Sequence, residues 1–214
     1  KGTDPFFTAV AQGEVHLVRR IAGYKKIRYY THENVGYGNI DLPDQEMHTT
    51  AVWWQVQPEA LDAAFPSRHM ALDGFLGAGY AMHIVAAMRM LSEQQDIGRA
   101  VGDGNAEWFA TVGANGRGQM RNSEGEAVDP GQLQQFTPTL FLYDNYPGGI
   151  GISAPLFEVR SAIVADAQQL VSACACRHGC PSCIGPILAS DEVRGYAPKQ
   201  VALQVLSLLS EQRE

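Results

Sequence analysis

The sequence has 214 residues, enough for one domain of ordinary size or two small ones, and 45% of them are hydrophobic. Its 16 basic and 23 acidic residues give a formal net charge of −7. This composition excludes a disordered tail, a collagen-like polymer and a polybasic arm for nucleic acids. No signal-peptide pattern occurs and no apolar run approaches a membrane span, so we expect a soluble, cytoplasmic chain. Because it begins with Lys1, we expect a piece of a larger protein.

β structure is expected first along the chain. Residues 15–21 and 24–30 are rich in β-branched, aromatic and long side chains, and Ala22-Gly23 between them predicts a hairpin turn. A second strand pair is expected from residues 36–42 and 49–56, the latter containing a bulky apolar stretch.

A long helix is expected over residues 70–91, where apolar residues recur at helical spacing along one stripe. Gly74, Gly77 and Gly79 weaken this helix intrinsically. We therefore expect them to allow close packing against a neighbouring element.

A polar, Gly-rich segment follows over residues 98–131. It predicts loops, with one hairpin around residues 108–112 and a tight turn at Asn115-Gly116.

The last third of the chain predicts a strand, a loop and two helices. Residues 138–143 form a short apolar run that suits a buried strand. It leads through a Gly-rich loop, residues 144–151, to Ser153, which is expected to cap a helix that runs almost directly into Cys174. Pro198 is expected in the first turn of an amphipathic terminal helix.

All the cysteines lie within ten residues, in the pattern C-x-C-x3-C-x2-C: Cys174, Cys176, Cys180 and Cys183. Such a cluster favours a tetrahedral structural Zn²⁺ site, with a disulfide pair and an iron–sulfur cluster as alternatives. The Cys-x-Cys half needs extended backbone to bring its side chains together. With four thiolates available, His178 is expected to face solvent rather than bind the metal. A closed four-thiolate site is structural, not catalytic.

The Gly-rich loop allows two interpretations. Asp144, Gly148 and Gly149 precede a helix N-terminus, an arrangement that can hold an anion through free backbone N–H groups. The alternative, which we favour, is a structural turn that needs its glycines for geometry. No phosphate-binding Gly-Lys-Ser/Thr motif occurs in the chain, and the scattered histidines match no catalytic metal motif. His83 is expected to be a hydrogen-bonded core residue.

A basic stretch stands out in this acidic chain. Between His16 and His32 no carboxylate occurs, and three tyrosines (Tyr24, Tyr29, Tyr30) are interleaved with five cations: Arg19, Arg20, Lys25, Lys26 and Arg28. Cations neutralise phosphates and tyrosines stack on bases, so the stretch is a candidate nucleic-acid contact. A solvated hairpin face is the alternative.

Three blocks carry a resemblance to a known family. They are residues 23–27 (GYKKI) with 40–43 (IDLP), residues 140–144 (LFLYD) with 147–151 (PGGIG), and residues 174–176 (CAC) with 179–184 (GCPSCI). Together they resemble the C-terminal zinc-binding (MrfA zinc-binding, MZB) domain of DEAD/DEAH-box-like superfamily 2 DNA helicases of the MrfA type. The likeness covers nearly the whole chain.

The resemblance implies a bacterial ATP-dependent DNA helicase with a role in DNA repair, whose ATP-binding and ATP-hydrolysing motor domains precede this region. It also implies that the four cysteines bind zinc. We expect residues 1–214 to form one α+β accessory domain with a β-rich part (1–57) and a mixed α/β part (58–214). In it, antiparallel β hairpins come first, then central helices, then a strand, Gly-rich loop and helix leading into the zinc site and a C-terminal helix. Such a fragment is expected to guide single-stranded DNA rather than to catalyse; docking of a repair or phage-defence partner is the alternative.

Overall fold

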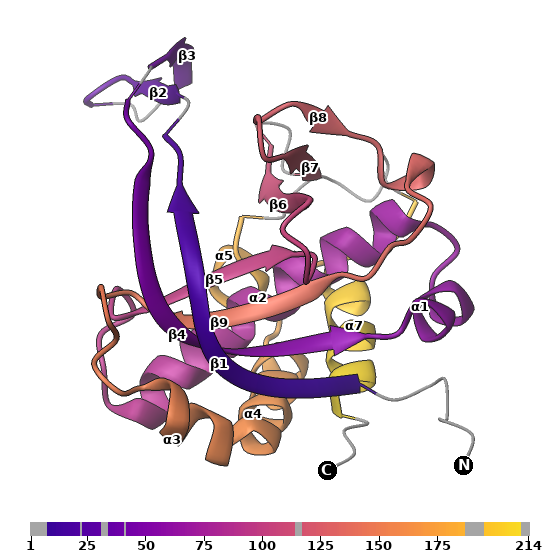
Figure 1. Ribbon diagram of the computed structural model, residues 1–214. Coiled ribbons are helices and arrows are strands. Elements are labelled where there is room, and N and C mark those ends of the chain that lie inside the picture. The colour runs from indigo at the N-terminus through magenta and orange to yellow at the C-terminus, as the bar shows by residue number, and fades with distance from the viewer. Residues whose placement is uncertain are drawn as a thin grey trace.

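The computed structural model describes residues 8–21, 23–30, 34–40, 42–113, 117–186 and 195–210 (Figure 1). A seven-stranded antiparallel sheet runs through them. Its strands, in spatial order, are β1 (Thr8–Arg19), β4 (Gln45–Val56), β9 (Thr139–Asp144), β5 (Ile97–Gly102), β6 (Trp108–Val112), β7 (Gly118–Asn122) and β8 (Ala127–Val128). With the helices on one face of this sheet, the expected α+β class is confirmed.

The strand pairing near the N-terminus differs from both predicted hairpins. β1 pairs along all 12 of its residues with β4, while β2 (Gly23–Ile27) pairs with β3 (Asn34–Asn39) in a separate two-stranded sheet. The β2–β3 hairpin therefore projects from the end of the β1–β4 ribbon, away from the body (Figure 1). The predictions were wrong because a nearby turn signal does not show that the better apolar partner of β1 lies beyond the hairpin.

Helices pack on one face of the sheet, and the longest of them passes behind it in Figure 1. They are α1 (Pro58–Ala64), α2 (Arg68–Met90), α3 (Ser153–Glu158), α4 (Arg160–Ala173), α5 (Pro181–Ile184) and α7 (Pro198–Ser210), with a short 3₁₀ turn at Pro130–Gln132. Alternate residues of β4, including Trp54, and the neighbouring Leu140 and Leu142 of β9 are fully buried in the same apolar core as Leu72 and Phe75 of α2.

The long central helix confirms the role expected for its glycines. A Cβ atom on Gly74 would lie 2.7 Å from Val205 of α7, and one on Gly77 would lie 3.0 Å from Ala202. At Gly79 the nearest atom belongs to Leu140 of β9. The missing side chains thus let α2 approach both α7 and the sheet.

By length and composition α2 alone, among the described residues, could cross a membrane, so the expectation of no such run was wrong. Its most apolar window is 72% buried inside the fold. The core therefore accounts for its hydropathy.

Several other elements differ from the predictions. α1 and β5 were not expected, and β6 and β7 form the predicted hairpin, although the turn at Asn115-Gly116 lies outside the described residues. Ser153 does not cap its helix: it is the first residue of α3, and its hydroxyl donates to Thr50 Oγ1 (2.8 Å). The expected single helix breaks at Val159 into α3 and α4.

Candidate metal centre and flanking surfaces

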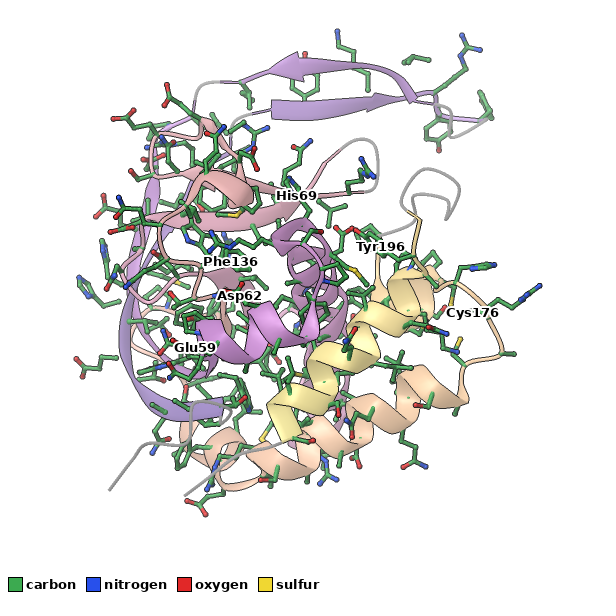
Figure 2. All side chains as sticks on the ribbon, turned by 90° about the vertical axis from the view of Figure 1, so that its right-hand side faces the viewer. Glu59, Asp62, His69, Phe136, Cys176 and Tyr196 are labelled. Atoms are coloured by element: carbon green, nitrogen blue, oxygen red, sulfur yellow. The ribbon has the colours of Figure 1, made fainter. Side chains whose placement is uncertain are left out.

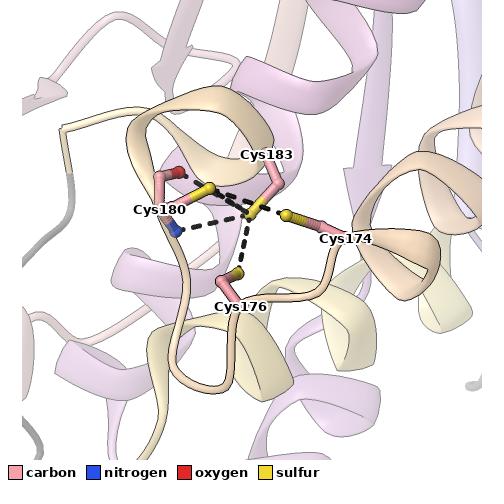
Figure 3. Close-up of side chains that lie close together, drawn as sticks. All are labelled: Cys174, Cys176, Cys180 and Cys183. Carbon is pink, nitrogen blue, oxygen red and sulfur yellow. Dashed lines mark hydrogen bonds between the residues drawn. The ribbon is translucent and has the colours of Figure 1, made fainter.

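Two helix ends bring the four cysteines together. Cys174 is the C-cap of α4, with extended backbone, and Cys176 follows it. Cys180 is the N-cap of α5, and Cys183 lies within that helix. Between the halves, Gly179 has φ +119°, and a Cβ there would overlap the Cδ1 atom of Ile184. Only glycine suits this reversal, which turns the two halves toward each other (Figure 3).

The sulfur atoms fit one tetrahedral ion. All four Sγ atoms lie within 4.8 Å of one another. The Sγ–Sγ distance is 3.6 Å for Cys174 and Cys180, 3.5 Å for Cys176 and Cys183, and 3.6 Å for Cys180 and Cys183. Zn–S bonds of about 2.3 Å in a tetrahedron place sulfurs about 3.8 Å apart. All four are free thiols, so the disulfide alternative was wrong.

The thiols differ in acidity because their surroundings differ. Burial raises the pKa of Cys183 to about 12 and also raises the pKa of Cys176. Burial also acts to raise the pKa of Cys180, but hydrogen bonds from the Ser182 N–H and from Cys174 outweigh this effect and lower that pKa to about 7. At neutral pH a metal ion must therefore displace protons from this cluster, and its affinity rises with pH.

A residue that the sequence did not reveal lies beneath this loop. Lys199, in the first turn of α7, is only 9% exposed, and its Nζ donates to the backbone carbonyls of Cys174 (2.6 Å) and Cys176 (3.0 Å). The available signal was weak: a lysine directly after Pro198, on a helix whose other inward residues are apolar. His178, by contrast, is exposed, and its backbone carbonyl accepts from the Lys199 N–H.

In the Gly-rich loop, the backbone donors already have an acceptor within the chain. The buried Asp144 carboxylate accepts through Oδ2 from the N–H groups of Ile150 (2.5 Å), Gly151 (3.0 Å) and Ile152 (3.3 Å). Gly148 and Gly149 have φ +79° and +73° and make the turn that returns these groups to the carboxylate. This geometry favours the structural turn over a site for an external anion.

The five predicted cations do not form one surface. Arg20 lies at the base of the β2–β3 hairpin, where it donates hydrogen bonds to both carboxylate oxygens of Asp44 (2.9 and 2.6 Å) and to the Ser123 carbonyl (2.8 Å). These hydrogen bonds lower the pKa of Asp44. Arg19 donates to Asn145 Oδ1 (2.8 Å). Both are therefore tied to the body of the domain.

The remaining cations belong to the hairpin itself. Lys25 and Lys26 lie in β2 and Arg28 directly follows it; the Lys26 ammonium sits 5.8 Å from the centre of the Tyr24 ring. Beyond them, Tyr29 and Tyr30 are 83% and 89% exposed and meet edge to face. Figure 2 shows this hairpin set apart from the body and from the labelled Cys176.

His83 of α2 is a hydrogen-bonded core residue, as expected. Its Nε2 lies 2.9 Å from the Gln94 carbonyl and 2.6 Å from that of Ile97, so Nε2 carries the proton and donates. Nδ1 then accepts from Arg99 (3.3 Å). Burial lowers the pKa of His83, and the Arg99 charge acts in the same direction.

Comparison with known proteins agrees with this geometry. The sequence matches the family model of the MrfA Zn-binding domain over residues 78–184, half of the chain. The protein named "Uncharacterized ATP-dependent helicase YprA", of Bacillus subtilis (strain 168), is 30% identical over 203 residues, which cover 95% of this chain and 22% of that protein. The crystal structure of the DUF1998 helicase MrfA bound to DNA is 28% identical, with a TM-score of 0.60, and the match covers 98% of this chain and 23% of that one.

The chain thus spans less than a quarter of the length of these relatives. The zinc-binding family and the four clustered cysteines together point to structural Zn²⁺, as the sequence predicts. On the family match, which includes the cysteine cluster and most of α2, this chain belongs to the MrfA Zn-binding domain family.

Proposed function

We propose that this chain is one accessory domain of a bacterial, cytoplasmic ATP-dependent superfamily 2 DNA helicase of the MrfA type, active in DNA repair, and that it guides single-stranded DNA beside the motor domains. ATP binding and hydrolysis are assigned to those motor domains, because this chain has no phosphate-binding motif. The family match and the helicase names of the two relatives support the helicase assignment.

Zinc has a structural part in this proposal, with Cys174, Cys176, Cys180 and Cys183 as its four ligands. The ion would join the end of α4 to α5 and supply folding free energy at the junction with α7. Because four thiolates fill its coordination shell, it would offer no open position for substrate or water.

The projecting β2–β3 hairpin is the observation that carries the DNA-guiding role. It holds Lys26 and Arg28 beside the strongly exposed Tyr29 and Tyr30, apart from the body (Figure 1). Cations follow a phosphate backbone and tyrosines stack on bases without sequence preference. Arg19 and Arg20 have a supporting role, because they tie the hairpin base to Asn145, Asp44 and Ser123.

Fluorescence polarisation with a labelled single-stranded oligonucleotide, titrated with salt, tests this role. Each phosphate contact contributes about 0.7 to the slope of log K against log salt, so K26A/R28A is expected to reduce the slope by about 1.4. R89Q/R160Q removes two charges from α2 and α4 as a control for net charge, and should leave the slope unchanged. An unchanged slope in K26A/R28A would remove the hairpin from the DNA path.

A protein-docking role is the second candidate, and the face of the sheet opposite the described helices favours it. A groove of about 300 Å³ lies there between β1, β9, β5 and β6, with Leu17, Phe109, Phe141 and Tyr143 among its lining residues. An apolar groove of this kind is better suited to binding a protein partner, such as a repair or phage-defence protein, than to binding a phosphate backbone. If the chain binds no single-stranded DNA at low salt, docking becomes the better proposal.

A further inference from the structure

The start of α7 and the cysteine loop are held together by one side chain. Lys199 is buried, and its ammonium donates to the carbonyls of Cys174 and Cys176, two residues apart. Its own N–H donates to the His178 carbonyl (2.8 Å), two residues further along the same loop. Lys199 therefore contacts three alternate carbonyl groups of the loop, those of Cys174, Cys176 and His178.

These two carbonyl contacts specify the conformation that the Cys-x-Cys half requires. In extended backbone, carbonyl groups and side chains both repeat every second residue. A single donor that holds the carbonyls of Cys174 and Cys176 on one side therefore also keeps the two thiols on a common side. A further turn of α4 would instead place side chains two residues apart about 200° apart around the helix axis, and would so separate the two thiols. α4 ends at Cys174.

The ammonium also meets two electrostatic needs. Carbonyl groups at a helix C-terminus lack intrahelical donors, and Lys199 supplies one to the C-cap residue of α4. Four thiolates around Zn²⁺ carry a net charge of −2, which a neighbouring buried cation partly balances. Burying a lysine ammonium is unfavourable unless the ammonium is hydrogen-bonded. Here the carbonyls of Cys174 and Cys176 accept its hydrogen bonds.

We propose that Lys199 is a positioning residue of the zinc site, which holds the Cys-x-Cys half in its ligating conformation without binding the metal. This rests on the ligand set given under the proposed function. Removing the ammonium should leave zinc binding at one ion per chain but make the ion more labile. Loss of such a supporting contact typically weakens metal binding about 10–100-fold.

Two measurements on the zinc-loaded 214-residue chain test the role. The first is the rate of zinc transfer to excess EDTA, followed with a colorimetric zinc indicator; K199M is expected to release zinc about 10–100-fold faster than wild type. The second is the visible absorption of the Co²⁺-substituted chain, which reports tetrahedral thiolate geometry and should change in K199M. K26M makes the same chemical change on the hairpin and should leave both readouts unchanged.

A second control separates positioning from general stability. V205A removes buried side-chain volume from α7 without touching the loop, so it should lower the unfolding temperature with little effect on zinc release. If V205A accelerates release as much as K199M at an equal loss of stability, the positioning role is refuted. If K199M does not fold, K199Q replaces it, and a folded K199Q with wild-type release and Co²⁺ spectrum refutes the role. Absence of zinc from the wild-type chain would instead refute the ligand set.

Discussion

Replacing Gly74 with alanine is expected to destabilise the domain, although alanine is the better helix former by about 1 kcal/mol. The new Cβ would lie 2.7 Å from Val205 Cγ2, and 2.9 Å from both Cγ1 and the backbone oxygen of Val201. A side-chain methyl can rotate away, but the backbone oxygen moves only if α7 moves.

The magnitude follows from these two opposing effects. Overpacking a dense core costs about 1–3 kcal/mol, and a contact with backbone belongs at the upper end of that range. Subtracting the helix-propensity gain of about 1 kcal/mol leaves a net loss of about 2 kcal/mol for Gly74→Ala. In a domain of this size that lowers the unfolding temperature by about 4–8 °C.

Gly79→Ala is the matched control in the same helix. Its Cβ would meet the flexible tip of Leu140, at 3.1 Å from Cδ1 and 3.5 Å from Cγ, which can adjust. We expect it to be neutral or slightly stabilising. Urea unfolding of the zinc-loaded variants, followed by far-ultraviolet circular dichroism, compares the two. A Gly74→Ala variant as stable as Gly79→Ala would refute the close α2–α7 packing.

Three further predictions concern the metal, a buried histidine and the Gly-rich loop. Chelation with EDTA, or Cys183→Ser, should unfold much of the domain, because structural zinc contributes on the order of 10 kcal/mol; an unchanged thermal melt would contradict this. His83→Gln should flatten the dependence of stability on pH. In wild type the native pKa of His83 is lowered, so just below pH 6.5 the unfolded state binds more protons than the native state, and stability falls with acidification by up to about 1.4 kcal/mol per pH unit. Equal slopes in both proteins would exclude His83 as the source of this dependence. Asp144→Asn should cost about 1.5–3 kcal/mol in urea unfolding, because the loop loses a charged acceptor for its three N–H groups; wild-type stability would contradict that role.

Elements with a strong local signal could be predicted from the sequence. The 3.6-residue period of α2 and the short apolar run of β9 identify these elements without any knowledge of what packs against them. The cysteine cluster was equally local, since its spacing alone brings four donors within reach of one ion.

Features that depend on distant partners could not be predicted. The pairing of β1 with β4 spans the whole intervening hairpin, and a turn signal beside β1 pointed to the wrong strand. Arg20 looked like a phosphate contact because its acceptors, Asp44 and Ser123, approach only in the folded chain. Lys199 was missed for the same reason: its acceptors lie on a loop more than 20 positions away.

The place of β9 in the sheet determines the order in which the domain can be completed during synthesis. β9 lies between β4 and β5 in space but follows both in the chain, and the cysteine loop and α7 follow it in turn. On the ribosome, the apolar face of α2 therefore emerges well before the strand and the helix that cover it. Such long-range closure is slow and leaves the nascent chain open to association with other chains. The cysteines follow β9 in the chain, so a chain that has its complete zinc-binding cluster already contains its central strand.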